Sequence, residues 1–157
     1  MNRPTLAQEV ANTTRRLYRG SSVMKFLLTS QDTNGALSII DVHMLAGTEP
    51  PRHVHDREDE VFIIKKGEIT FFIGENIVKG RPGDVIFAPR RVAHTFRIDT
   101  PAAKVLTIIT PGDFAQFFWK QSVPYSAGEP VAPVGSPSQS AIQSVMKYAS
   151  EYGARFV

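Results

Sequence analysis

Short runs of alternating apolar and polar residues, separated by turn residues, fill the first two thirds of the chain. A period of two is typical of half-buried β-strands. These runs predict extended segments at 23–28, 36–46, 60–66, 68–73, 84–88, 94–98 and 104–110. Many short strands at this spacing favour an all-β sandwich or barrel.

Turn residues mark the connections between these runs. Asn34-Gly35 is a strong two-residue hairpin signal, and Gly67 predicts a second hairpin between its flanking runs. Gly74-Glu75-Asn76 closes a further turn. Arg81-Pro82-Gly83-Asp84 places Pro and Gly at the central positions of a type II turn.

A short helix is expected after the last strand. Asp113 can cap it, with Gln116 three residues later completing a capping-box pattern. Phe114, Phe117 and Phe118 then form an apolar stripe at helical spacing. The stripe favours a core or dimer contact over a substrate-binding role.

A second helix is expected near the end of the chain, after a Pro- and Gly-containing loop at 121–135. Ser136 is its predicted N-cap, with Pro137 at the first helical position, and Gly153 ends it. The periodicity predicts a buried face made of Ile142, Val145, Met146, Ala149 and Tyr152.

The length of 157 residues favours a single domain. Its predicted barrel core covers about 23–110, and a helical C-terminal extension covers about 113–153. The chain has no cysteine, which excludes thiol chemistry. With 42% hydrophobic and 21% charged residues, the composition is that of an ordinary globular protein.

The formal net charge of +3 does not predict a nucleic-acid partner. The basic residues form short pairs such as Arg15-Arg16 and Arg90-Arg91, with acidic residues between them and no nucleic-acid-binding motif. No apolar run approaches the ~20 residues of a membrane span, and the N-terminus lacks the apolar stretch of a signal peptide. We therefore expect a cytoplasmic protein without a membrane partner.

Three of the four histidines fall into one pattern with a carboxylate. Its spacing is Gly47-x5-His53-x-His55-x4-Glu60-x6-Gly67, followed by Gly83-x5-Pro89-x4-His94. Three imidazoles and a carboxylate that converge on one point make a divalent transition-metal site. Metal binding is thus favoured over a fortuitous cluster, with ligands at His53, His55, Glu60 and His94.

Strand parity places these side chains inside the barrel. His53 and His55 project from the same face of a strand, because side chains alternate. Phe62 and Ile64 follow Glu60 by two and four positions, so they share its strand face. Phe96 and Ile98 share the strand face of His94 for the same reason. They predict an apolar substrate pocket around the site, lined by Phe62, Ile64, Phe96 and Ile98.

The donor set of three nitrogens and one oxygen suits Mn, Fe, Co, Ni, Cu or Zn, and does not choose among them. Four ligands on an octahedral ion leave two positions open, so the site can be catalytic. Glu58 is the rival carboxylate, because it shares the strand parity of Glu60. His43, alone in a strand, is interpreted as structural.

On these motifs the chain resembles the cupin superfamily. The first cupin motif matches in full from Gly47 to Gly67, and the second matches at Gly83, Pro89 and His94. The second motif departs from the family at Arg91, where Gly is usual, and at Ile98, where Asn is frequent.

Stretches outside the motifs are similar to small single-domain bacterial cupins related to quercetin 2,3-dioxygenase. They include Asp32 to Ala36, Arg57 to Phe62, His94 to Arg97, Thr110 to Phe114 and Glu151 to Gly153.

The resemblance implies a double-stranded β-helix (jelly-roll) barrel with the metal inside, bound by the same four residues, and a homodimer. Arg91 carries a conformational cost if it has a positive φ. The resemblance also suggests a metal-dependent dioxygenase that acts on a phenolic or enolic small molecule, with Glu60 as the catalytic base. The alternative is a small-molecule-binding cupin without catalysis, or an isomerase of a sugar or keto compound, because one fold supports many functions.

Overall fold

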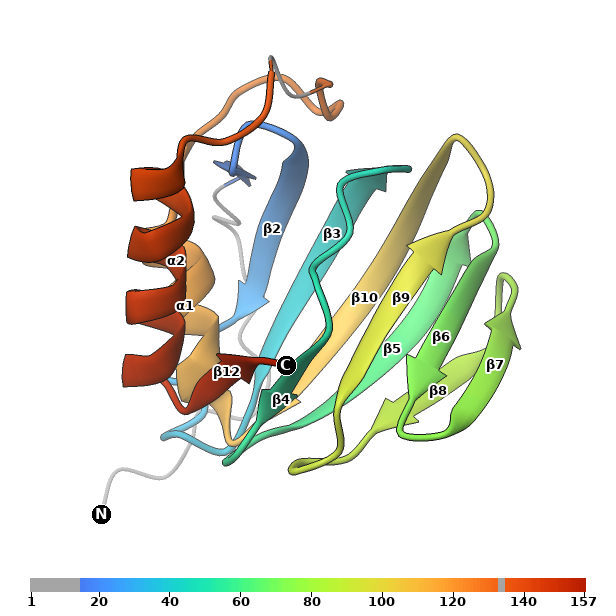
Figure 1. Ribbon diagram of the computed structural model, residues 1–157, viewed down its shortest axis with the longest axis horizontal. Helices are drawn as coiled ribbons and strands as arrows, with labels where there is room; N and C mark the ends of the chain where they lie inside the picture. Colours follow the sequence, from blue (N-terminus) through green and yellow to red (C-terminus); the bar gives the residue numbers. More distant parts are fainter. Residues whose placement is uncertain (1–14, 133–134) are drawn as a thin grey trace.

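Two antiparallel β-sheets face each other in the computed structural model, which describes residues 15–132 and 135–157 (Figure 1). The seven-stranded sheet has the order β11-β1-β2-β3-β10-β5-β8, and the five-stranded sheet has the order β12-β4-β9-β6-β7. The strands are β1 Arg15–Tyr18, β2 Ser22–Leu28, β3 Ser38–Leu45, β4 His53–His55, β5 Asp59–Lys66, β6 Ile69–Ile73, β7 Asn76–Gly80, β8 Val85–Ala88, β9 His94–Ile98, β10 Ala102–Thr110, β11 Ser122–Pro124 and β12 Ala154–Phe156. This architecture is a double-stranded β-helix, so the predicted fold class is confirmed.

The chain passes repeatedly from one sheet to the other. Strands β4, β6, β7 and β9 belong to the five-stranded sheet. Strands β5, β8 and β10, which come between and after them in the chain, belong to the seven-stranded sheet. Residues that are near in sequence therefore face each other across the interior. This alternation positions the candidate site.

The core lies between the sheets and follows the predicted alternation. Burial alternates strictly along β3 and along β10. Ile40, Val105 and Ile109 are almost completely buried, as are Ile64, Ile69 and Phe71 from the neighbouring strands. Each sheet buries one apolar face against the other sheet, which is the packing expected for two antiparallel sheets that face each other.

Gly67 does not form the predicted hairpin. Strand β5 pairs with β10 and β8, whereas β6 pairs with β7 and β9, so Gly67 lies where the chain crosses between sheets. The short linker resembles a hairpin in sequence, because both connections need a positive φ, here +85°. A Cβ at Gly67 would lie 2.5 Å from the Ala102 carbonyl oxygen.

The Asn34-Gly35 prediction is wrong in loop length. Strands β2 and β3 do pair antiparallel, but the connection runs over residues 29–37. Asn34 and Gly35 both have positive φ, as the dipeptide predicts. The Arg81 to Asp84 turn is confirmed: Gly83 has a φ of +97°, and the Asp84 N–H donates to the Arg81 carbonyl at 2.9 Å.

Five strands were absent from the predicted segments, namely β1, β4, β7, β11 and β12, although strand parity had placed His53 and His55 of β4 on one strand. They have three to five residues each, and most of β7 is exposed at a sheet edge. Strands β1, β11 and β12 lie outside residues 23–110 and extend both sheets.

Two short helices lie along one side of the sandwich, next to β2 and β12 (Figure 1). A 3-10 turn, η1 at Gly112–Phe114, leads into α1 at Ala115–Lys120. Neither has a side-chain cap, so the predicted capping role of Asp113 is wrong. Within the described residues, no helix has the length and apolar character needed to cross a membrane.

Helix α2 spans Gln139–Glu151, and Gly153 follows it with a positive φ. Its N-cap is Ser138, which accepts from the Ala141 N–H, and not the predicted Ser136. Ala149 is buried as expected, but Ile142 and Met146 are 43% and 48% exposed. The periodicity located the helix correctly but assigned too wide a buried face.

Replacing Gly67 with alanine tests the crossover. Gly67→Ala combines left-handed strain with a backbone clash, so we expect a loss of about 3 kcal/mol in unfolding free energy from urea denaturation. Gly83→Ala is the matched control, because its φ is also positive but nothing lies within 4 Å of the added Cβ. It should lose about 1 kcal/mol. Equal losses would contradict the crowded crossover.

Candidate metal centre

Three histidines and one glutamate converge at one end of the interior. One ligand atom from each of His53, His55, Glu60 and His94 lies within 4.8 Å of those of the others. His55, Glu60 and His94 are 1%, 4% and 2% exposed. The four residues predicted as ligands are therefore brought together by the fold, although ligation itself stays a prediction.

Strand pairing explains the convergence. His53 on β4 is directly opposite His94 on β9 within the five-stranded sheet. Glu60 lies on β5 in the facing sheet, opposite Ile109 of β10. The four-residue linker between His55 and Glu60 is thus the segment that crosses from one sheet to the other.

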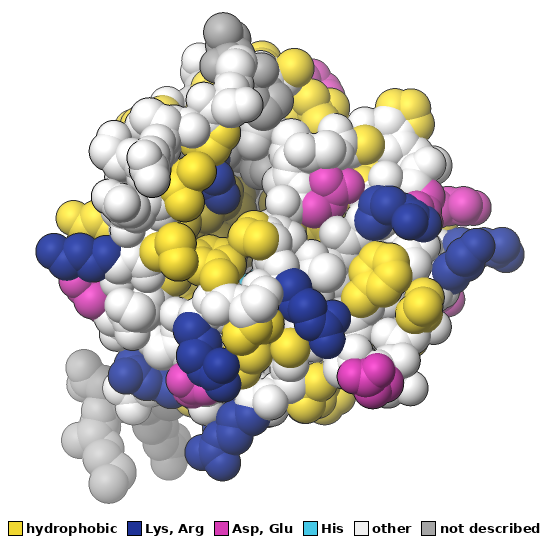
Figure 2. Space-filling model, in the orientation of Figure 1, with side chains coloured by type: hydrophobic (Ala, Val, Ile, Leu, Met, Phe, Trp, Pro, Cys, Tyr) yellow, Lys and Arg dark blue, Asp and Glu magenta, His cyan; other side chains and the backbone are white. Residues whose placement is uncertain are grey.

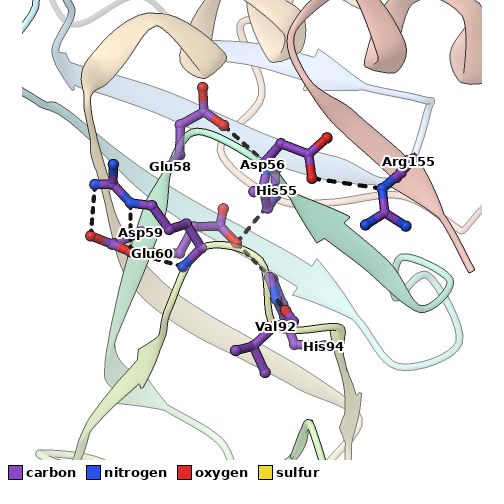
Figure 3. Close-up of polar contacts among 9 residues, drawn as sticks. His55, Asp56, Glu58, Asp59, Glu60, Val92, His94 and Arg155 are labelled. Carbon is purple, nitrogen blue, oxygen red and sulfur yellow. Dashed lines mark hydrogen bonds and ion pairs between the residues drawn. The ribbon is translucent and has the colours of Figure 1, made fainter.

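Glu60 lies between two of the imidazoles (Figure 3). Its Oε2 is 2.9 Å from His94 Nε2 and 3.4 Å from His55 Nε2. The rival carboxylate, Glu58, is also buried, but it lies outside the cluster of four. Of the two carboxylates, Glu60 alone occupies the centre.

Backbone carbonyls orient two of the imidazole rings. The Nδ1 atom of His53 is 2.8 Å from the Pro51 carbonyl oxygen, and that of His94 is 3.1 Å from the Val92 carbonyl oxygen. A carbonyl accepts only from a protonated nitrogen, so these contacts assign the proton to Nδ1. A neutral ring with its proton on Nδ1 offers the Nε2 lone pair to an ion. In the metal-free structure the Nε2 atom of His94 lies at hydrogen-bond distance, 2.9 Å, from the accepting Glu60 Oε2, and an ion would take the place of the proton in that contact.

Opposing effects set the protonation of the cluster. Burial lowers the pKa of His55, but the carboxylates of Glu60 and Glu58 outweigh burial and raise the pKa to about 10. Burial lowers the pKa of His53 to about 4, against the attraction of Glu60. Burial also raises the pKa of Glu60, but His55 and His94 outweigh it and hold that pKa well below its usual range. The metal-free cluster is therefore a carboxylate balanced by a cationic His55.

This donor set fits a divalent transition ion. It offers imidazole nitrogens and one carboxylate oxygen, a combination suited to several such ions. A positive charge already balances the carboxylate in the metal-free cluster, and a bound cation takes the place of that proton.

A cavity of about 120 Å³ leads to the cluster. Figure 2 shows the hollow, which is walled mainly by hydrophobic side chains and has a Lys or Arg side chain inside it. Phe62 and Phe96 line the cavity, as do Tyr18 and Arg19. Ile64 and Ile98, which were predicted beside them, are buried in the core and are not among the lining residues.

The phenylalanine stripe belongs to the core, as predicted, and also reaches the cavity. Phe114, Phe117 and Phe118 line the cavity as well as packing with each other. The ring of Phe114 lies 4.3 Å from that of His55, edge to face. Helical spacing alone gave no signal that these rings face the site.

Arg91 has a φ of +64°, as its place at a usual glycine position suggested. Its backbone N–H donates to the His55 carbonyl oxygen at 2.7 Å. The turn between β8 and β9 is thereby attached to β4, and the strained residue lies three positions before His94. His43 lies away from the cluster, with its Nδ1 atom 3.6 Å from Glu129.

Comparison with known proteins agrees with this geometry. A family model described as a cupin domain matches residues 40–110. Quercetin 2,3-dioxygenase of Bacillus subtilis (strain 168) is 24% identical over 110 residues, which are 70% of this chain and 33% of that protein. The chain thus spans about a third of the length of this relative.

Several solved structures share the fold. A predicted oxalate decarboxylase from Thermotoga maritima has a TM-score of 0.56 and 23% identity, over 67% of this chain and 98% of that one. An RmlC-like cupin from Shewanella frigidimarina has a TM-score of 0.57 and 20% identity, over 67% and 92%. A cupin-superfamily sugar phosphate isomerase from Silicibacter pomeroyi has a TM-score of 0.54 and 18% identity, over 67% and 75%. At these identities the likeness shows the fold alone.

The chain therefore contains a cupin domain, matched over residues 40–110, with its histidine-glutamate cluster at the position that the cupin motifs predict. It is a distant homologue of quercetin 2,3-dioxygenase.

Metal titration of the purified protein tests the cluster. We expect the wild type to bind one Co²⁺ or Zn²⁺ per chain by isothermal calorimetry, and His94→Ala to bind at least ~100-fold more weakly, because it loses a ligand. His43→Ala is the control, since His43 is a histidine outside the cluster. Equal binding by the two variants would exclude this site.

The His55 pKa predicts how the metal-free protein responds to pH. Folded His55 holds its proton up to about pH 10, whereas an unfolded histidine loses it near 6.5. The stability from this proton is complete below pH 6.5 and is lost as the pH rises through about 10. In chelator, the wild type should lose on the order of a few kcal/mol more than His55→Gln between pH 7 and 10. Parallel denaturation curves for the two proteins would contradict the assignment.

Proposed function

We propose that this protein is a metal-dependent dioxygenase that acts on a phenolic or enolic small molecule. The observation that carries the proposal is an apolar, aromatic cavity that ends at the cluster of three histidines and Glu60. The distant homology to a quercetin 2,3-dioxygenase supports the same reaction class.

A divalent ion held by these four residues supplies Lewis-acid chemistry, which lowers the pKa of a substrate hydroxyl. The chain's own part is to bind and orient the substrate and to accept its proton. Glu60 is the base nearest to such a hydroxyl, with its Oε2 at the centre of the cluster. A dioxygenase adds both atoms of one O₂ to a substrate that supplies the electrons, so no external reductant is required.

The cavity wall favours a planar, apolar body on the substrate. Phe62, Phe71 and Phe96 pack with ring centroids 5.2 to 6.1 Å apart, and Phe114 closes the wall beside His55. These rings offer faces and edges for stacking on an aromatic substrate and exclude water from its reacting carbons. A space of about 120 Å³ is near the ~150 Å³ cavity that holds one benzene ring. Catechol-sized compounds are therefore the first candidates.

The two alternative functions use the same cavity. A sugar or sugar phosphate needs many polar partners. The cavity's basic side chains are Arg19 and Arg155, and its other walls are largely apolar. This lining favours the phenolic substrate over an isomerase substrate. Binding without turnover remains the second outcome of the assay below. Homodimer formation stays a prediction.

Oxygen uptake tests the proposed activity. Wild-type protein loaded in turn with Mn, Fe, Co, Ni, Cu or Zn is mixed with catechols, enediols and flavonols, and O₂ consumption is followed by electrode. We expect uptake with at least one pair, and a loss of about 10²–10⁴-fold in kcat for Glu60→Gln under metal saturation. Asp59→Asn is the control, because Asp59 pairs with Arg90 and not with the cluster.

Stoichiometric binding of these compounds by calorimetry, without any O₂ uptake, would overturn the dioxygenase proposal and support a binding function.

A further inference from the structure

Glu58 is a buried carboxylate that the proposed chemistry does not use. It is 3% exposed, and its Oε2 atom has no hydrogen-bond partner among the described residues. This oxygen lies 3.6 Å from His55 Nδ1, which is also buried and has no hydrogen-bond partner in the described part of the chain (Figure 3). A buried carboxylate oxygen without a hydrogen bond costs free energy, so its presence requires an explanation.

The other two histidines show what the His55 ring lacks. His53 and His94 each have an Nδ1 atom within 3.1 Å of a backbone carbonyl two residues earlier in the chain. His55 has no such carbonyl contact in the described structure, and its Nδ1 faces the Glu58 carboxylate instead. The three rings are thus arranged alike, with Nδ1 directed away from the centre and an oxygen nearby, and for His55 that oxygen is a carboxylate.

We propose that Glu58 is the positioning carboxylate of His55, which accepts from the Nδ1–H group and keeps Nε2 directed at the metal ion. This inference rests on the proposed metal site, but not on the dioxygenase reaction. A carboxylate that accepts from the non-coordinating N–H of a metal-binding imidazole fixes the orientation of the ring and raises the basicity of its coordinating nitrogen. Glu58 comes three residues after His55, so one short turn carries both the ligand and its support.

The charges of the site agree with this role. Three neutral imidazoles and two carboxylates carry a charge of about −2, which one divalent cation neutralises. Glu58 is therefore less costly in the metal-bound protein than in the metal-free one.

Two substitutions separate charge from hydrogen bonding. Glu58→Gln keeps the shape and an acceptor oxygen but removes the charge, and Glu58→Leu removes both. Asp59→Asn is the matched control, because it removes the next carboxylate along the chain, which is directed at Arg90. The readouts are the Kd for Zn²⁺ from chelator competition, the visible spectrum of the Co²⁺ form, and the urea stability of the metal-free protein.

We expect Glu58→Leu to weaken Zn²⁺ binding by 10- to 100-fold and Glu58→Gln by a smaller factor. Asp59→Asn should stay within about threefold of the wild type, since the Asp59 charge is paired with Arg90 and lies outside the cluster. The Co²⁺ spectrum should change in Glu58→Leu and be restored toward the wild type in Glu58→Gln. Glu58→Leu should lower the metal-free stability, because it removes a buried carboxylate that faces the cationic His55.

The results that would contradict the metal site can be told apart from those that would contradict the role of Glu58. A wild type that binds no metal overturns the metal site itself. Wild-type metal binding together with unchanged Kd values in both Glu58 variants overturns only the role of Glu58. Equal weakening by Asp59→Asn and Glu58→Gln indicates a general charge effect and also overturns it. If Glu58→Leu does not fold, the comparison of Glu58→Gln with Asp59→Asn decides.

Discussion

The rest of the structure depends on keeping a carboxylate and three imidazoles together in an apolar interior. Ionisable groups are rarely buried unless they are paired, because removal from water is costly. Here Glu60 lies between the imidazoles of His55 and His94. The Nδ1 atoms of His53 and His94 contact backbone carbonyl oxygens, which orients these two rings. The surrounding aromatic side chains strengthen these interactions by excluding water.

The topology meets this requirement by bringing both sheets to the same point. His53, His55 and His94 come from the five-stranded sheet, and Glu60 faces them from the other. The chain crosses between the sheets once between His55 and Glu60 and again at Gly67. At Gly67 only glycine fits both the positive φ and the space available. Arg91 shows a related compromise, because a residue in a left-handed conformation attaches the turn before His94 to β4.

Much of the fold and the four clustered residues could be predicted from the sequence, because both depend on local spacing. Alternation located the long strands, and the H-x-H pair, the following glutamate and the distant histidine located the cluster. Sheet membership could not be read locally: Gly67 has the sequence of a hairpin but joins two different sheets. Ile64 and Ile98 were wrongly expected to line the pocket for the same reason. Their side chains do point inward, but they are buried in the core and do not reach the cavity. Phe114, at the end of η1, contacts His55 through a tertiary contact that periodicity does not reveal.

The central claim is that His53, His55, Glu60 and His94 together hold one divalent ion. X-ray absorption spectroscopy of the protein loaded with one equivalent of Zn²⁺ or Co²⁺ tests it most directly, because imidazole ligands give a characteristic multiple-scattering signal. The account predicts a shell of nitrogen and oxygen donors that fits three imidazoles, with two of them lost in a His53→Ala/His55→Ala double variant. A shell of oxygen donors alone, or a spectrum that the double variant leaves unchanged, would contradict it.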